Sequence, residues 1–286
     1  MKRILTALLL LGALASCKPA LEQRVMARFV PERSDDFVFE NDLVAGRFYG
    51  QALEGNPTSP GIDIWVKLPG KLVANDWYKG YETESDEYYH HDHGGKDCYK
   101  VAVSLGGGAS SPLIDGKLCY PATNFRSWEI VEDSPEKVVF TLHYPQWQTP
   151  DSVMVALDKT VTVMSGSYFC EAEDVYTFEG ADTLAIAAGM NIHAALETVD
   201  KQLVQPGRVA IWEHASDTTF EPEDGMLGVG VVMPDADGTG FSGDGSHLLV
   251  WKYITSGQPV RYSFGSCWSK GNIQTAQDWF KRVLEQ

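Results

Sequence analysis

The sequence has few basic residues for its length. Of its 286 residues, 23 are Lys or Arg and 39 are Asp or Glu, which gives a formal net charge of −16. A surface of this sign repels the phosphates of nucleic acids and of anionic lipids, so we expect neither as a partner. The charge by itself indicates an acidic, well-solvated surface and no particular ligand.

Several familiar site signatures are also absent. There is no Gly-x-Ser-x-Gly elbow, no His-Glu-x-x-His pair and no Cys-x-x-Cys spacing, which argues against the hydrolases and zinc sites that use them. We expect no resident cofactor. Beyond residue 17 the cysteines are Cys98, Cys119, Cys170 and Cys267. An exported protein can form disulfides, and we expect Cys98 to pair with Cys119 because both flank one loop system.

The N-terminus lacks an apolar run long enough to span a bilayer. Its apolar stretch, residues 4–14, is shorter than the roughly 20 residues that a spanning helix needs. The stretch follows Lys2 and Arg3 and precedes Ala15 and Ser16. This order of basic, apolar and small residues is typical of an export signal.

The segment Leu14-Ala15-Ser16-Cys17 resembles the bacterial lipobox, and the resemblance implies that Cys17 is acylated. Lys18 and Pro19 follow it, as in lipoproteins sent to the outer membrane. We therefore expect a signal peptide over 1–16, a lipidated tether over 17–28, and a location at the cell envelope. The membrane would be contacted only through the lipid on Cys17.

The remainder, 29–286, has the pattern of a single β-rich domain. Short runs of valine, threonine and aromatic residues alternate with Gly, Pro, Asn, Asp and Ser, which is typical of antiparallel strands. Asp158 and Lys159 separate two such runs and predict a two-residue hairpin. The expected strands cover 37–40, 43–49, 62–68, 99–103, 138–144, 153–157, 160–164, 168–178, 184–190, 208–212, 226–233 and 247–254.

The C-terminus has the one clear helical pattern. From Asn272 onwards, apolar residues recur at helical spacing and predict an amphipathic helix that covers a sheet. These residues are Ile273, Ala276, Trp279, Phe280, Val283 and Leu284. The expected fold class is all-β, with antiparallel sheets and a C-terminal amphipathic helix.

The densest group of reactive side chains is the segment 88–97, Tyr-Tyr-His-His-Asp-His-Gly-Gly-Lys-Asp, which we call the histidine loop. Three interpretations of it remain open. In the favoured one, Tyr89 transfers a proton beside the carboxylate of an acidic sugar, with His91 or His93 as its partner. In the second, His91 and His93 coordinate a metal with Asp92 or Asp97. In the third, the loop only hydrogen-bonds its own backbone.

Sugar recognition combines aromatic faces with charged side chains. The candidate substrate-binding residues are Tyr88, Asp92, Arg126, Trp128, Trp251, Lys252 and Trp268. Arg126 is the expected clamp for a uronate carboxylate, because a guanidinium fork fits that group. Each tryptophan is equally consistent with a place in the core. His193 ends an expected strand and is either a satisfied core histidine or a functional one.

The sequence resembles an uncharacterised Bacteroidetes family called domain of unknown function 4861. The resemblance rests on Ser34 to Gly50, Gly61 to Trp65, the histidine loop and Asp97 to Val101, and it covers essentially the whole mature chain. Such proteins tend to be encoded among polysaccharide-utilisation genes, often beside enzymes that degrade pectin or other uronates. The resemblance therefore implies an oligosaccharide or polysaccharide ligand.

Two segments, Glu40 to Val44 and Lys159 to Val163, also resemble strands of the galactose-mutarotase-like supersandwich. That fold consists of two large antiparallel sheets packed face to face, and its concave face binds sugars. Because a fold does not fix a function, this resemblance narrows the substrate class more than the reaction.

The supersandwich resemblance implies two kinds of chemistry. Its lyases use a tyrosine and a histidine, which Tyr89, His91, His93 and His193 would supply here. Its mutarotases pair a histidine with a glutamate, for which His193 and Glu213 are the nearest analogues. We expect a carbohydrate-active protein that acts on uronate-containing, pectin-like oligosaccharides by Tyr/His acid–base chemistry. The alternatives are a non-catalytic glycan-binding lipoprotein and a metal-dependent glycan hydrolase.

Overall fold

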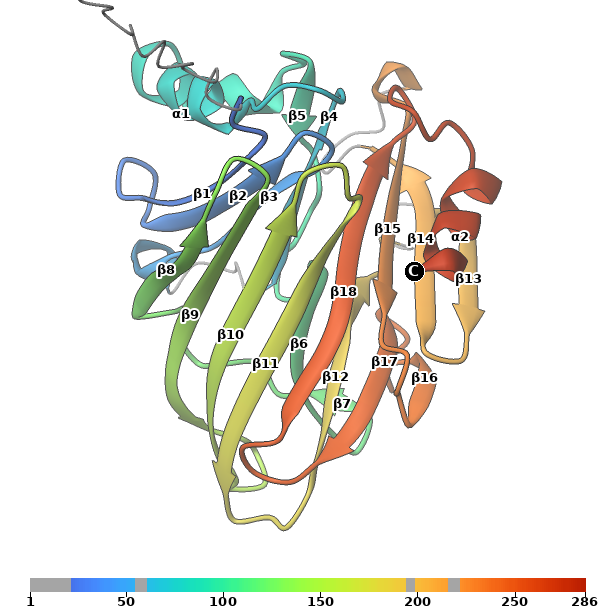
Figure 1. Cartoon of the computed structure of the whole chain (residues 1–286). Coiled ribbons are helices and arrows are strands. Elements are labelled where there is room, and N and C mark those ends of the chain that lie inside the picture. Colours follow the sequence, from blue (N-terminus) through green and yellow to red (C-terminus); the bar gives the residue numbers. More distant parts are fainter. Residues whose placement is uncertain (1–21, 55–60, 194–198, 216–221) are drawn as a thin grey trace, which may run out of the picture.

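The computed structural model describes residues 22–54, 61–193, 199–215 and 222–286. The expected signal peptide and Cys17 lie outside the described residues. The described strands form three sheets, and their pairings are antiparallel (Figure 1). With a helix at the C-terminal end, this confirms the expected all-β, antiparallel fold class.

The large sheet has eight strands in the order β13-β14-β15-β18-β11-β10-β9-β8. The second sheet has five strands in the order β16-β17-β12-β6-β7 and packs against one face of the large sheet. The strands of the large sheet are β8 Ser127–Asp133, β9 Lys137–Gln148, β10 Met154–Met164, β11 Phe169–Glu179, β13 Val199–Gln205, β14 Arg208–His214, β15 Met226–Val232 and β18 Pro259–Trp268. Those of the second sheet are β6 Gly107–Ile114, β7 Lys117–Leu118, β12 Leu184–Asn191, β16 Gly238–Phe241 and β17 His247–Ile254.

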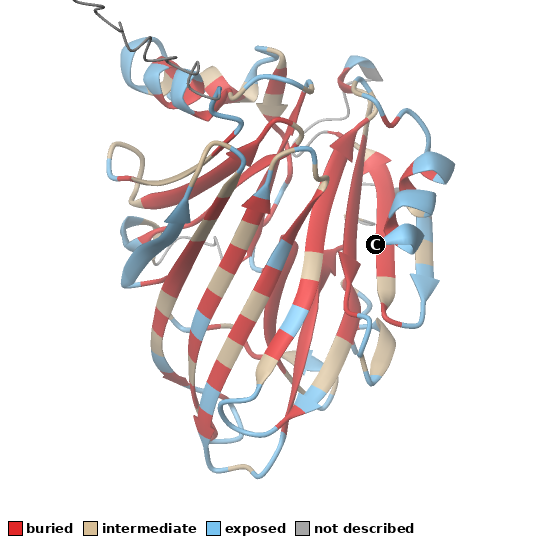
Figure 2. Cartoon of the chain, in the orientation of Figure 1, coloured by how far each residue is buried: buried red, intermediate tan, exposed pale blue. Residues whose placement is uncertain are grey.

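The core lies between these two sheets. Along β9, β10 and β11 buried residues alternate with more exposed ones, because successive side chains of a strand point to opposite faces (Figure 2). Strand β12, in the middle of the second sheet, is buried at every position. The inner faces supply a continuous apolar cluster that includes Phe140, Val161, Ile186, Val229 and Phe264.

A third sheet, in the order β1-β2-β3-β4-β5, comes from the N-terminal part of the chain. It consists of β1 Val25–Val30, β2 Asp36–Asn41, β3 Ala45–Phe48, β4 Ile62–Lys67 and β5 Gly95–Asp97. Short 3-10 turns lie at Gln51–Leu53 and Tyr88–His90 in this part of the chain, and at Pro222–Asp224 before β15. Strand β1 begins inside the expected tether 17–28, because Val25 is fully buried and pairs with Asn41 of β2.

The predicted hairpin at Asp158 and Lys159 is wrong, because β10 runs through both residues without a turn. Lys159 points inwards, and its Nζ lies 2.5 Å from Oδ2 of Asp174, its direct neighbour on β11. Asp158 points outwards and pairs with Nδ1 of His143 at 2.7 Å. Each polar residue has a partner on an adjacent strand, so neither needs to leave the sheet.

Helix α1, Ala74–Thr83, was not predicted. It buries Trp77 and Tyr78 against the N-terminal sheet. Its first turn has no local capping side chain; the carboxylate of Glu40 on β2 accepts hydrogen bonds from the backbone N–H groups of Val73 at 2.7 Å and Ala74 at 2.9 Å. A cap supplied by a distant strand leaves no start signal in the local sequence.

Helix α2, Ala276–Glu285, confirms the predicted C-terminal helix. Thr275 caps it by accepting a hydrogen bond from the N–H of Asp278. Trp279 is fully buried against β14 and β15, where a Cβ on Gly228 would lie 2.7 Å from its ring. The helix therefore covers one end of the outer face of the large sheet (Figure 1). Neither described helix is long and apolar enough to cross a membrane.

The expected disulfide between Cys98 and Cys119 does not form. All four cysteines that the structure describes are buried thiols. Burial raises the pKa of Cys119, Cys170 and Cys267, so these thiols stay protonated. They behave as small apolar core residues.

Candidate functional site

The side chain of Tyr89 in the histidine loop points into the interior of the protein. Tyr89 is 3% exposed, and its hydroxyl accepts a hydrogen bond from Nε of Arg33 at 3.3 Å. Its ring lies 5.1 Å from the guanidinium carbon of Arg47. A phenol in this position contacts two arginines and has no surface to offer to a sugar.

Arg47 is the centre of a buried charge network. Its Nε lies 2.8 Å from Oδ2 of Asp63 and its Nη2 lies 2.7 Å from Oδ2 of Asp97, the last residue of the histidine loop. Asp36 lies 3.6 Å from Nη1 of Arg47 and 3.0 Å from Nη1 of Arg33. Burial raises the pKa of Asp36 to about 6 and, with the nearby charge of Asp97, that of Asp63 to about 8. Asp97, the last residue of both the loop and β5, thus anchors them to this network.

In the exposed part of the loop, His93 and Asp92 have partners within the protein. The ring of His93 stacks on Tyr88, with centroids 3.9 Å apart and planes 5° apart. The carboxylate of Asp92 accepts hydrogen bonds from the N–H groups of Gly94 and Gly95, and it pairs with Lys270 at 3.0 Å. His91 is exposed. Within the ranges that the structure describes, no three His, Cys, Asp or Glu side chains gather as metal ligands. The backbone bonds to Asp92 are those of the third interpretation, but Asp92 and Asp97 also pair with Lys270 and Arg47 outside the loop.

The three candidate tryptophan platforms have different surroundings. Trp268 is 3% exposed, and its Nε1 donates to the carbonyl oxygen of Asp224. Trp251 is partly buried, and its ring packs over the backbone of Gly238 on β16, while the adjacent Lys252 pairs with Asp235. Only Trp128 is substantially exposed, at 41%.

Arg126 does not approach the histidine loop. Its guanidinium faces Glu54, with Nη1 donating to Oε1 and Nη2 donating to Oε2. Arg126 lines a hollow of about 290 Å³ with Trp128 and Phe29. The structure therefore brings Arg126 together with Trp128 and separates both from Tyr89, His91 and His93.

A second polar cluster forms where β12 and β14 end. Nδ1 of His193 lies 2.8 Å from Oε1 of Glu213, while Nε2 lies 2.7 Å from the carbonyl oxygen of Lys100 and 2.7 Å from Nδ2 of Asn191. The hydroxyl of Tyr99 donates to Oδ1 of Asn191 at 2.6 Å. We call these five residues the His193 cluster. The expected strand 99–103 is not formed, because this segment supplies Tyr99 and the Lys100 carbonyl to the cluster.

Electrostatics favour a positive charge on His193. Burial opposes that charge, but the hydrogen bond and negative charge of Glu213 outweigh it and raise the pKa of His193. Glu213 is 1% exposed, and its Oε2 has no hydrogen-bond partner among the described residues. The side chain of His193 is 10% exposed, and the neighbouring Lys100 is exposed. The cluster is a buried carboxylate that orients an imidazole near the surface.

Sequence reasoning connected His193 with Glu213 only through the mutarotase resemblance, and it missed Tyr99, Lys100 and Asn191. Asn191 stands two residues before His193, which places both at the end of β12. Tyr99 and Lys100 lie in a loop that crosses to β12 only in the folded protein. The sequence carries no signal for that crossing.

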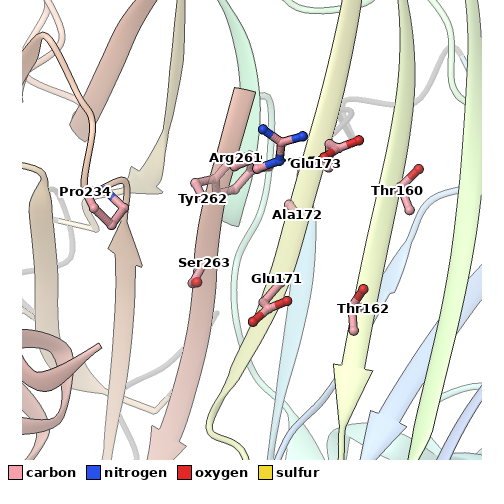
Figure 3. Close-up of a pocket in the computed structure, with 9 residues that line it drawn as sticks. All are labelled: Thr160, Thr162, Glu171, Ala172, Glu173, Pro234, Arg261, Tyr262 and Ser263. Atoms are coloured by element: carbon pink, nitrogen blue, oxygen red, sulfur yellow. Dashed lines mark hydrogen bonds and ion pairs between the residues drawn. The ribbon is translucent and has the colours of Figure 1, made fainter. Parts of the chain in front are cut away.

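A further hollow, of about 470 Å³, lies on the outer face of β10, β11 and β18 (Figure 3). Arg261 and Glu173, direct neighbours on adjacent strands, pair at 2.6 Å. Thr162, Glu171 and Ser263 lie in the next row. Tyr262, the aromatic residue that lines the hollow, is 3% exposed and directs its hydroxyl to Asp174 and Lys159. We assign no site here, because no aromatic face is available.

The fold and the cluster together define an all-β protein of antiparallel sheets with a partly buried His–Glu pair. A family model described as "Domain of unknown function (DUF4861)" matches residues 15–286, so the chain belongs to this family. "Uncharacterized protein P7" of Formosa agariphila is 29% identical over 91% of this chain and 66% of its own length. The chain thus spans about two thirds of that relative.

Among solved structures, the crystal structure of 4-alpha-glucanotransferase from Thermococcus litoralis matches 85% of this chain and 39% of that chain. Its identity is 8% and its TM-score is 0.37. A likeness at this level carries no argument about fold or function.

Proposed function

We propose that this protein is a carbohydrate-active protein of the cell envelope that performs acid–base chemistry on uronate-containing oligosaccharides at the His193 cluster. The observation that carries the proposal is the 2.8 Å contact between Nδ1 of His193 and the almost fully buried carboxylate of Glu213. A carboxylate on one ring nitrogen fixes the orientation of an imidazole and leaves the other nitrogen to exchange a proton.

The roles follow from the contacts. Nε2 of His193 is the proton-transfer atom, and a substrate oxygen would replace the Lys100 carbonyl as its hydrogen-bond partner. Glu213 stabilises the imidazolium. Asn191 lies beside the ring, with its Nδ2 2.7 Å from Nε2, and its Oδ1 accepts a hydrogen bond from the hydroxyl of Tyr99. Lys100 is exposed, and its charge acts on His193, so it is the cation available for a sugar carboxylate. It takes the role that the sequence suggested for Arg126.

The test is turnover by the purified protein of saturated and unsaturated pectic fragments, followed by chromatography and ultraviolet absorbance. We expect His193→Ala to lower turnover by about 10²-fold or more, the usual contribution of a general acid or base. Lys100→Ala should raise KM for uronates at unchanged kcat. His91→Ala, in the exposed part of the histidine loop, is the matched control and should have no effect. Full activity in His193→Ala would refute the proposal.

Glycan binding without turnover is the second candidate. It is favoured by the hydrogen bonds that both ring nitrogens of His193 already make within the protein. Calorimetric titration in which pectic fragments bind, remain intact, and lose affinity in Lys100→Ala would support this candidate over catalysis. Elemental analysis of the same preparation tests the metal-dependent hydrolase.

A further inference from the structure

The hollow beside Trp128 has the features of a preformed surface site. It lies where β8 begins, next to the turn between β1 and β2, and its volume is about 290 Å³. Phe29, Asp35 and Gln51 line it together with Arg126 and Trp128. It therefore combines aromatic, amide, carboxylate and guanidinium groups from three elements that are far apart in the sequence.

The aromatic part of the hollow is a packed group of rings. The rings of Phe29 and Trp128 are stacked, with centroids 5.8 Å apart and planes 21° apart, and Phe37 supports Trp128 from the core at 5.6 Å. Trp128 nevertheless keeps 41% of its surface exposed. An indole that is held in place but left partly uncovered offers a face to an apolar surface such as one side of a pyranose ring.

The guanidinium that lines the hollow is already paired with a carboxylate. Arg126 and Glu54 form a two-pronged pair, and their side chains are 34% and 26% exposed. The hydrogen bonds from Arg126 lower the pKa of Glu54, so the carboxylate is charged and matches the guanidinium. A sugar carboxylate would have to displace Glu54. A hydroxyl pair, in contrast, can donate to the carboxylate and accept from the guanidinium edge without breaking the pair.

We propose that this hollow, lined by Phe29, Trp128 and Arg126, whose guanidinium is paired with Glu54, is a binding subsite for an uncharged pyranose with neighbouring hydroxyls. It is separate from the His193 cluster and does not depend on the proposed function. Strand β8 forms one edge of the large sheet, and β14, which carries Glu213, is six strand positions away (Figure 1). At about 4.8 Å for each position, the separation across the sheet is about 29 Å.

The subsite would hold a neutral unit of a glycan chain on the protein surface. Arg126 alone would favour an acidic sugar. Because Glu54 occupies its guanidinium, we expect the subsite to favour a neutral sugar instead. A polysaccharide that contains both neutral and acidic sugars would therefore meet two different sites, one at Trp128 with no free cation and a cationic one at Lys100.

The experiment uses the full chain labelled with 5-fluorotryptophan and observed by fluorine NMR, with the Trp128 resonance assigned by Trp128→Phe. The probes are neutral galactan and xylan oligosaccharides and galacturonate oligomers of equal length. We expect the neutral probes to shift the Trp128 resonance, and the galacturonate oligomers to leave it unchanged at the same concentration. No shift with any neutral probe, or equal shifts with both classes, would overturn the proposal.

Three variants sharpen this test. Trp128→Ala should weaken neutral binding at least tenfold in calorimetry, while Tyr253→Ala, at a more exposed aromatic residue on β17, should not change it. Glu54→Gln leaves the hollow intact but releases the guanidinium, so it should gain binding of galacturonate oligomers. His193→Ala should keep the Trp128 shift, which separates failure of this subsite from failure of the acid–base site. If neutral oligosaccharides bind Trp128→Ala as well as the parent protein, their binding site lies elsewhere and the proposal is wrong.

Discussion

The histidine loop and the His193 cluster show opposite relations between sequence and structure. The loop concentrates histidines and tyrosines within ten consecutive residues, yet its buried members support Arg47 and its exposed members contact one another. The His193 cluster is assembled from three separate segments, and it places a buried carboxylate on a partly exposed imidazole. Density along the chain is therefore a weaker sign of a site than convergence in space.

The strongest way to test this difference is to remove the cation that the loop supports. Arg47→Met leaves Asp36, Asp63 and Asp97 buried without their main partner, so we expect a loss of about 3–5 kcal/mol in the free energy of unfolding. Urea unfolding measures it. His91→Ala, which changes only the exposed part of the loop, is the control and should stay within about 0.5 kcal/mol of the parent. An Arg47→Met protein of parental stability would contradict a structural role for the loop.

The His193 cluster should show a smaller but titratable effect. In Glu213→Gln the imidazole loses a charged partner, so we expect a lower pKa for His193 in an NMR titration and a loss of about 2 kcal/mol in stability. Because Glu213 raises the pKa of His193, the loss should be complete below the pKa of an unfolded histidine. It should shrink as the pH rises through the folded pKa.

The exposed pair of His143 with Asp158 provides a matched control for that prediction. Asp158→Asn should change stability by less than about 1 kcal/mol, since both side chains are open to solvent. Equal effects from Glu213→Gln and Asp158→Asn would mean that burial adds nothing to the His193–Glu213 pair.

The charge network beneath the histidine loop predicts a pH dependence of its own. Burial raises the pKa of Asp63 to about 8 from its ordinary value of 3.8, so the folded state retains a proton that the unfolded chain releases. Stability should therefore fall as the pH rises from about 4 to about 8, by up to about 1.4 kcal/mol per pH unit. Asp63→Asn, which is neutral throughout, should have a flatter profile in urea unfolding. Parallel profiles for the two proteins would count against the raised pKa.

The smallest expected effect is at the exposed stack of the histidine loop. His93→Ala removes the contact with Tyr88, and we expect a loss of about 0.5 kcal/mol, with the proposed turnover unchanged. A large loss of turnover in His93→Ala would reverse the comparison and return the loop to the centre of the chemistry.

The sequence predicted the parts of the fold whose cause is local. The period of apolar residues defined α2, and apolar runs located five of the eight strands of the large sheet and two of the five of the second sheet, while β6 and β18 were missed. It failed where a distant partner decides the outcome. Glu40 caps α1 from β2, and Asp174 holds Lys159 inside β10, so a helix was missed and a hairpin was predicted wrongly.

The candidate site was predictable to a lesser degree. The sequence left His193 as either a core histidine or a functional one. Glu213 was named as its partner only through the resemblance to mutarotases. Arg126 and Trp128 were identified as neighbours in the sequence, but nothing there showed that Glu54 would occupy the guanidinium or that Phe29 would support the indole.

By itself, the sequence determined the class of the protein, because hydrophobic period, turn residues and net charge are properties of short segments and of composition. Tertiary structure alone decided which polar side chains are buried, paired or exposed. These properties depend on contacts between residues far apart in the chain, and the electrostatic environment of each group is set by those contacts. Tyr89 and His193 illustrate the point: both were candidate catalytic residues in the sequence, and folding buried one beneath two arginines and joined the other to a carboxylate.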